Sequence, residues 1–278
     1  MANNISNNRI NIIFWNKLLS VALAYFFYLL FLIILQQFFN KYLSVIISQL
    51  TFIFSLIILT GKKLNYDTIK IDFRINKIKN PKNYIYIIIA FILLEIFVSL
   101  LVYFQSAFIP DFLKDILEKI SEYNSLLNDI NYNNLPIVIF SLAIMPALVE
   151  ELIFRGYLQK IFEEVVHYKK AIIITSIIFA SAHFNLFNFL PLFFISIVIG
   201  FIAYYTNSVF PGMIIHFLIN LTTIIVKLFE KSNQIFIKGA KIDFDMVFYM
   251  FLSITSLIII TKIFKKQNQP KIDNQQIQ

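Results

Sequence analysis

The chain has 278 residues, of which 59% are hydrophobic and 14% charged, and its formal net charge is +8. Soluble domains average about 45–50% apolar and about 25% charged residues, so this apolar surplus excludes a single soluble core and indicates lipid as the solvent. The sequence contains no cysteine, which excludes disulfides and thiolate metal sites. In a membrane protein a basic excess is typical of loops beside anionic lipid, so we expect no nucleic-acid partner.

The apolar residues form runs that are too long for strands, and they lack the two-residue alternation of a membrane barrel. Helices of about 17–25 residues are long enough to cross the hydrocarbon core. The sequence therefore predicts an all-α, polytopic transmembrane bundle of about eight helices, with residues 1–278 forming one transmembrane domain. The predicted spans are residues 15–39, 43–60, 84–104, 135–154, 171–188, 190–206, 212–229 and 245–264.

Loop charges predict the orientation of these spans. The loop at 61–83 carries seven Lys and Arg residues against two Asp, whereas the loop at 106–134 carries five acids against two Lys. Lysines recur in 155–170 and in the tail that begins at Lys262. Because basic loops stay in the cytoplasm, we expect a multi-pass cell-membrane protein with both termini cytoplasmic. The abundance of Asn, Ile, Lys and Phe is typical of an AT-rich bacterial genome.

Two adjacent carboxylates end the fourth predicted span. Inserting an ionisable residue into a membrane span costs at least about 2.5–3.5 kcal/mol of free energy on insertion scales, so the presence of Glu150 and Glu151 there requires an explanation. Glu151 and Arg155 lie four residues apart on one helix face, which suits an ion pair, while Glu150 points about 100° away without a local cation. This asymmetry indicates a structural role for Glu151 and a role in the chemical reaction for Glu150. The alternative is that both mark the membrane–water boundary. One turn earlier, Pro146 predicts a kink.

Three further polar side chains lie inside predicted spans. His183 lies within 171–188, and His216 and Asn220 lie four residues apart on one face of 212–229. Each alone is accounted for by an ordinary hydrogen bond between helices. A carboxylate, two imidazoles and an amide from three separate helices, however, are typical of a functional site in an apolar bundle.

These residues form three motifs in a fixed order: Glu-Glu-x-x-x-Arg at 150–155, Phe-x-x-x-His at 179–183 and His-x-x-x-Asn at 216–220. In this respect the sequence resembles the CPBP family, the CAAX proteases and bacteriocin-processing or immunity proteins related to type II CAAX prenyl endopeptidases. The core of the resemblance covers residues 135–229, the expected catalytic core. It implies an intramembrane endopeptidase that hydrolyses a peptide bond of a membrane-associated protein or peptide near the cytoplasmic face.

The resemblance also implies a role for each motif residue. Glu150 would be the general base that activates water, and His183 would position and polarise that water. His216 and Asn220 would donate hydrogen bonds to the oxyanion of the tetrahedral intermediate. The supporting residues would be Glu151, Arg155 and Phe179.

Two questions follow from this assignment. The predicted boundaries place His183 about 18 Å deep, with Glu150 and His216 shallower, so the span at 171–188 would have to tilt or begin deeper. Glu150, His183 and His216 could alternatively form a zinc site of two histidines and a carboxylate. The sequence has no His-Glu-x-x-His motif, and no separate base remains if Glu150 is a ligand. We therefore expect catalysis without a metal or other cofactor.

Two other classes of protein stay open at this stage. The first is a non-proteolytic bacteriocin self-immunity or membrane scaffold protein of the same fold. The second is a transporter in which Glu95, in the middle of the third span, relays protons; the sequence shows no inverted repeat in its favour. The resemblance suggests as substrate either a C-terminal peptide with a lipid modification or a bacteriocin precursor.

Overall fold

The computed structural model describes residues 2–60, 66–78, 80–108, 110, 126–233 and 244–268, and every regular element among them is helical. The predicted all-α fold is therefore confirmed. Most of the acidic loop at 106–134 lies outside the described residues. The elements are α1 Ala2–Leu35, α2 Lys41–Leu59, α3 Tyr66–Asp72, α4 Lys82–Phe108, α7 Leu135–Ile139, η1 Phe140–Ile144, α8 Met145–Glu151, η2 Leu152–Leu158, α9 Gln159–Glu163, α10 Tyr168–Ser181, α11 Phe189–Thr206, α12 Phe210–Asn233 and α13 Phe244–Asn268.

Six of the described helical segments are long and apolar enough to cross a membrane, so the chain is a multi-pass membrane protein. They lie in α1, α2, α4, the continuous run from α7 to α9, α11 and α12. The eight spans expected from the sequence differ from these six at two places. The fifth predicted span is realised as α10, whose 14 residues extend only about 21 Å. The eighth lies along α13, of which the side chains are described from Met250 onward.

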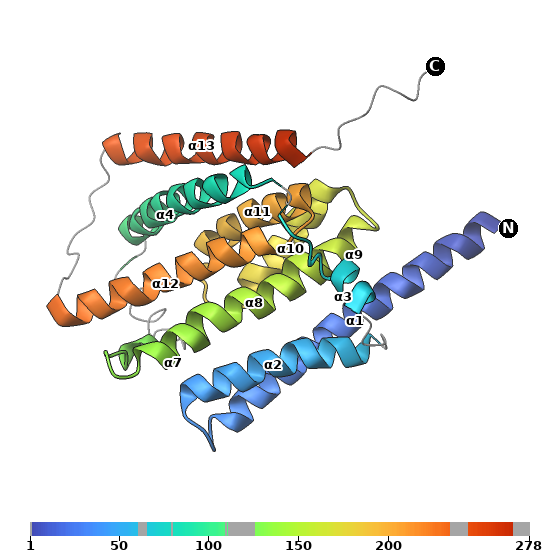
Figure 1. The fold of residues 1–278 in the computed structure, drawn as a ribbon, viewed down its shortest axis with the longest axis horizontal. Helices are drawn as coiled ribbons and strands as arrows, with labels where there is room; N and C mark the ends of the chain where they lie inside the picture. The colour runs from blue at the N-terminus through green and yellow to red at the C-terminus, as the bar shows by residue number, and fades with distance from the viewer. Residues whose placement is uncertain are drawn as a thin grey trace.

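The helices form layers around a central helix, which we define as the run α7 to α9, Leu135–Glu163 (Figure 1). The hairpin of α1 and α2 packs on one side of it through α2. On its other side lies α12, which packs in turn against α4 and α11, and α4 packs against α13 at the opposite edge. The central helix is thus covered on both sides by other helices.

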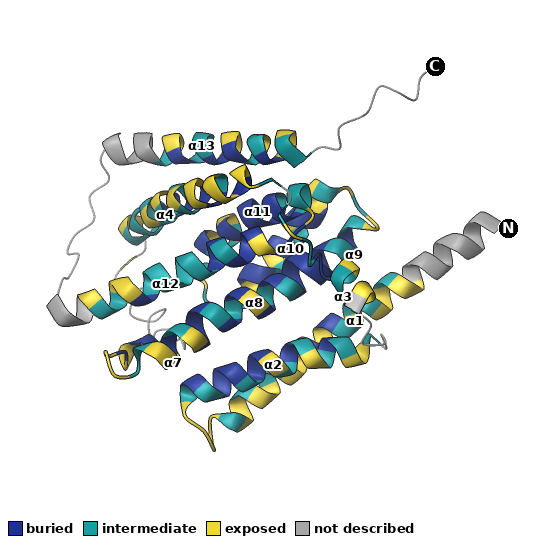
Figure 2. Ribbon diagram, in the orientation of Figure 1, coloured by how far each residue is buried: buried dark blue, intermediate teal, exposed yellow. Residues whose placement is uncertain are grey.

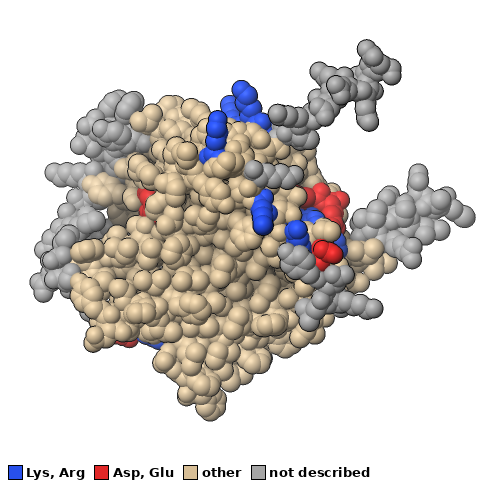
Figure 3. Space-filling view, in the orientation of Figure 1, with Lys and Arg blue, Asp and Glu red and all other residues tan. Residues whose placement is uncertain are grey.

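Apolar side chains cover the outer faces of this bundle. Trp15 on α1, Ile58 on α2 and Phe251 on α13 are 62%, 75% and 65% exposed. Figure 2 shows the most buried positions on α8, α10 and α11 and many exposed ones on the outer helices. In Figure 3 most of the visible surface is neither acidic nor basic, and many of its charged side chains gather where α3 and α9 lie. A large apolar surface of this kind requires lipid rather than water around it.

The central helix contains two π-helical turns, one on each side of α8. In η1, the Met145 N–H donates to the Phe140 carbonyl five residues earlier, directly before Pro146, which has no N–H to donate. The break predicted at Pro146 therefore takes the form of a widened turn. The second turn, η2, follows Glu151. Single π turns inside α-helices are frequent at functional sites, and here they flank the two glutamates.

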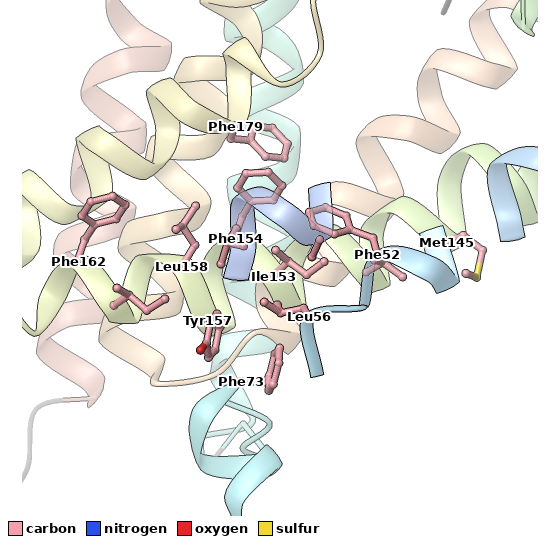
Figure 4. Close-up of a cluster of buried hydrophobic side chains, with 14 of the residues drawn as sticks. Phe52, Leu56, Phe73, Met145, Ile153, Phe154, Tyr157, Leu158, Phe162 and Phe179 are labelled. Atoms are coloured by element: carbon pink, nitrogen blue, oxygen red, sulfur yellow. The ribbon is translucent and has the colours of Figure 1, made fainter. Parts of the chain in front are cut away.

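Close helix packing holds the second π turn. In Figure 4, side chains of η2 meet Phe52 and Leu56 of α2, and Phe73 stacks on Tyr157 with ring centroids 5.3 Å apart. A Cβ added to Gly156 would lie 2.6 Å from the Phe73 carbonyl oxygen, so only glycine allows this approach.

The segment after α3 is anchored to the interior by Arg74, which sequence reasoning counted only as a loop charge. Arg74 is buried, adopts a φ of 51°, donates to the Arg155 carbonyl at 3.2 Å and pairs with Glu163. Its own carbonyl accepts from the Val209 N–H at 3.1 Å. These contacts tie the segment to the end of the central helix and to the start of α12.

Candidate active site

The predicted site residues come from the central helix, the end of α10 and α12. Glu150 lies thirteen residues before the end of the central helix at Glu163, and His183 lies fifteen residues after the start of α10 at Tyr168. At 1.5 Å per residue, both therefore lie about 20 Å from the junction of α9 and α10. The fourth span continues to Glu163 instead of ending at 154, which moves Glu150 to the middle of a helix.

Glu151 joins two of these elements. Its side chain is 0% exposed, and its Oε1 accepts from Arg155 at 2.7 Å and from His216 Nδ1 at 2.9 Å. The predicted ion pair with Arg155 is therefore present. Its second partner, His216, comes from α12, so one buried carboxylate holds the central helix and α12 together. An Arg–carboxylate pair without solvent needs such additional hydrogen bonds, because removing the charges from water costs several kcal/mol per ion.

A glycine in the first turn of α12 makes this contact possible. A Cβ added to Gly212 would lie 2.8 Å from Glu151 Oε2 and 2.7 Å from the Ile199 Cγ2 methyl group. Any larger residue would therefore push α12 away from the carboxylate or displace the carboxylate itself. The approach of His216 to Glu151 thus depends on the absence of a side chain at position 212.

Glu150 leaves the helix in another direction and faces α2 and the end of α10. Its Oε1 accepts from Gln49 Nε2 at 3.2 Å, and its Oε2 lies 3.8 Å from His183 Nε2. The Glu150 and His183 side chains retain 14% and 32% of their exposure. Both side chains thus keep some exposed surface, in contrast to Glu151, although Glu150 Oε2 itself is buried.

The hydrogen bond on the other ring nitrogen of His183 determines how this pair interacts. His183 Nδ1 lies 2.8 Å from the Phe179 carbonyl oxygen, which can only accept, so Nδ1 carries the proton. In the neutral imidazole, Nε2 is then an acceptor. Two acceptors, Nε2 and Glu150 Oε2, thus face each other at a distance too long for a direct hydrogen bond.

The Phe179 ring supports three of these groups. The guanidinium of Arg155 lies 4.3 Å from its centroid, and the rings of His183 and His216 lie 4.8 and 5.9 Å away. Phe154 meets it edge-on at 5.1 Å, as Figure 4 shows. Phe179 therefore makes a cation–π contact with Arg155 and also contacts the imidazole rings of His183 and His216.

Comparison with known proteins bears on this same part of the chain. Residues 132–222 match the family model described as Type II CAAX prenyl endopeptidase Rce1-like. This segment is Rce1-like. The predicted resemblance to CAAX proteases is thereby confirmed, and the match to a family of proteases supports a peptidase at a coarse level. No curated protein and no solved structure matches the chain.

The Rce1-like segment contains all three motifs, but their last residue is not joined to the others. Asn220 lies one turn after His216 on α12 and is partly buried. Among the described residues, no hydrogen bond that we find involves its side chain. The pair predicted as oxyanion donors is therefore divided, with His216 held by Glu151 and Asn220 left for another contact.

The alternative zinc site would require Glu150, His183 and His216 of the Rce1-like segment to lie together. Glu150 Oε2 and His183 Nε2 face each other, while the contact of His216 is with Glu151. Within the described ranges, no three His, Asp or Glu side chains are grouped so that they could hold a metal ion. The arrangement thus fits a two-residue pair better than a three-ligand zinc site.

Two contacts of the site come from outside the Rce1-like segment and were missed in the sequence. Gln49 on α2 donates to Glu150, and the Tyr25 hydroxyl on α1 donates to the Ala182 carbonyl at 2.6 Å. Gln49 is a polar residue in the middle of an apolar span, a signal that could have been used. Tyr25 carries no such signal, because tyrosine is common in membrane helices. Glu95, which would relay protons in the transporter hypothesis, lies on α4 near Thr222 of α12.

Proposed function

We propose that this protein is an intramembrane endopeptidase that hydrolyses a peptide bond of a membrane-associated protein or peptide with a water activated by Glu150. One observation carries the proposal: Glu150 Oε2, a buried oxygen without a hydrogen-bond partner among the described residues, faces His183 Nε2 inside an apolar bundle. The match of residues 132–222 to a protease family supports the same reaction class.

A water beside this pair can donate one O–H to Glu150 Oε2 and the other to His183 Nε2. Its lone pairs are then free to attack a peptide carbonyl carbon. As the C–O bond forms, the water proton on Glu150 moves to the carboxylate, and the carbonyl oxygen becomes an oxyanion. General-base assistance of this kind contributes about 10²–10⁴-fold in rate.

We assign stabilisation of the oxyanion to His216 and Asn220. Because His216 Nδ1–H is directed at Glu151, its Nε2 donates to the oxyanion only when the ring is an imidazolium. Asn220 supplies a neutral amide donor that has no hydrogen bond among the described residues. When the intermediate collapses, the C–N bond breaks, and protonated Glu150 returns its proton to the leaving amine.

The proposed setting follows from the same features. Residues 1–278 form one transmembrane domain with a catalytic core at 135–229, and the reaction occurs near the cytoplasmic face, without zinc or another cofactor. The start of α1 and the end of α13 lie at the same end of the bundle, which supports termini on the same side, the cytoplasmic one by loop charge (Figure 1).

The test compares peptides released from membranes that contain the wild-type protein, Glu150→Gln or Glu164→Gln at matched expression. Glu164 is the matched control, because it pairs with Lys17 at the surface and lies outside the site. We expect peptides that disappear only in Glu150→Gln and persist with a zinc chelator. Identical peptide profiles in all three membranes would refute the proposal and favour a self-immunity or scaffold protein of this fold. Loss of the peptides with the chelator would instead indicate a zinc enzyme.

A further inference from the structure

The α1–α2 hairpin lies outside the Rce1-like segment, yet it contacts both members of the pair proposed for water activation. From α2, Gln49 Nε2 donates to Glu150 Oε1 at 3.2 Å. From α1, the Tyr25 hydroxyl donates at 2.6 Å to the carbonyl of Ala182, the residue before His183. Neither contact lies within one helix or between neighbouring motifs, so neither is a by-product of local structure.

We propose that this hairpin completes the active site and that Gln49 and Tyr25 are positioning residues for Glu150 and His183. The inference rests on the proposed endopeptidase function. The α1–α2 hairpin, which lies outside the family match, would then directly affect the rate of that reaction.

The position of Gln49 determines which carboxylate oxygen is free. A carboxylate that rotates about its Cγ–Cδ bond exchanges its two oxygens, so a base that must face His183 needs its other oxygen held. Gln49 holds Oε1 and leaves Oε2 toward His183. The Gln49 side chain is buried, and among the described residues its own Oε1 has no hydrogen-bond partner. A buried amide in a lipid-spanning helix is costly, which indicates that its N–H contact matters.

Tyr25 acts on the other half of the pair through the backbone. The last carbonyls of a helix have no partner within the helix, and Ala182 follows directly after the end of α10. The Tyr25 hydroxyl satisfies this carbonyl and so anchors the turn that carries His183. Its ring is itself fixed, with Tyr28 stacked at 5.7 Å and Phe52 of α2 at 5.6 Å.

The hairpin is fixed well enough to serve this purpose. Phe52 and Leu56 of α2 belong to the same buried cluster as Ile153 and Phe154 of the central helix, as Figure 4 shows. α1 packs along α2, and α2 packs against α8, which carries Glu150. Gln49 is therefore held relative to Glu150 by buried apolar contacts on a rigid helix.

The test measures kcat and KM of the purified full-length protein in liposomes for Gln49→Met and Tyr25→Phe. Gln49→Met keeps the length of the side chain and removes the donor, and Tyr25→Phe removes one oxygen. Two matched controls lie on the same hairpin. Ser48→Ala removes a buried hydroxyl that donates to the Ser44 carbonyl within α2, and Tyr42→Phe removes a hydroxyl that donates to the Leu126 carbonyl, away from the site.

We expect each site variant to lower kcat by about 10- to 100-fold, with KM and the melting temperature nearly unchanged, because small displacements of a catalytic group have effects of this size. The controls should keep the wild-type kcat. Wild-type kcat in both site variants, or the same fall in the controls, would overturn the inference. This differs from failure of the proposed function, in which the wild-type protein itself would cleave no peptide. If Gln49→Met fails to fold, Tyr25→Phe still decides the question through kcat.

Discussion

The substitution Gly212→Ala tests how closely α12 must approach Glu151. The added Cβ would lie 2.8 Å from Glu151 Oε2 and 2.7 Å from the Ile199 methyl group, closer than such atoms normally come. Overpacking of this kind typically costs about 1–3 kcal/mol. Replacing glycine by alanine in a helix returns about 1 kcal/mol. The expected net loss of unfolding free energy is therefore about 0–2 kcal/mol.

The effect on activity should exceed this modest loss of stability. The atom displaced is the carboxylate that holds His216 Nδ1 at 2.9 Å, and relief of the clash requires that carboxylate or α12 to move. A loss of about 1.4 kcal/mol in transition-state stabilisation lowers the rate tenfold, so we expect at least a tenfold lower kcat.

A second glycine provides the control. A Cβ on Gly200 would lie 2.9 Å from an Ile172 methyl group and 3.0 Å from Gln159 Oε1, a similar clash that does not touch Glu151. Thermal unfolding in detergent and peptide cleavage would be measured for both variants. Gly200→Ala should lower the melting temperature and keep its activity per folded molecule. Equal activity of the two variants would refute the reasoning, because overpacking alone would then explain both.

Three further predictions concern buried charge and packing. Arg155→Met leaves the buried Glu151 carboxylate without its cation and should destabilise the protein by about 3–5 kcal/mol, measured by denaturant unfolding; a change below 1 kcal/mol would contradict a buried pair. Gly156→Ala should be more damaging than Gly200→Ala, because its Cβ meets the Phe73 backbone and not a mobile side chain, and expression with thermal unfolding would rank the two. Arg74→Met and Glu163→Gln should be non-additive in a double-mutant cycle by about 0.5–3 kcal/mol, whereas additive effects would show that their ion pair contributes nothing.

The local part of the site could be predicted from the sequence because helical periodicity determines it. Glu151 and Arg155 lie four residues apart, so any helix brings them together, and the different direction of Glu150 follows from the same geometry. The order of the three motifs likewise sufficed to predict the resemblance to the family. These inferences needed no knowledge of how the helices pack.

The end of α10 could not be predicted in this way. The apolar run continues through Phe184 and Leu186, so hydropathy extends the span to residue 188, whereas the helix stops at Ser181. Phe184 then adopts a φ of 49°, a conformation unusual for a bulky residue and invisible in the composition. The true end of the fourth span at Glu163 was hidden for the opposite reason, because charges near its end resemble a loop.

Contacts between distant segments were beyond sequence reasoning. Gln49 and Glu150 are separated by 101 residues, and Tyr25 and Ala182 by 157. No periodicity relates such positions, and an apolar bundle offers many alternative pairings. The close approach of Gly212 to Glu151 depends on the angle at which α12 packs against the central helix.

Isotope labelling tests whether Glu150 activates a water to hydrolyse a peptide bond. The purified protein in liposomes would be incubated in ¹⁸O-labelled water with a model CAAX peptide and with peptides identified from membranes. We expect that wild-type protein releases a fragment whose new carboxyl group carries one labelled oxygen, and that Glu150→Gln releases none. Equal release by both proteins would show that Glu150 is not the base.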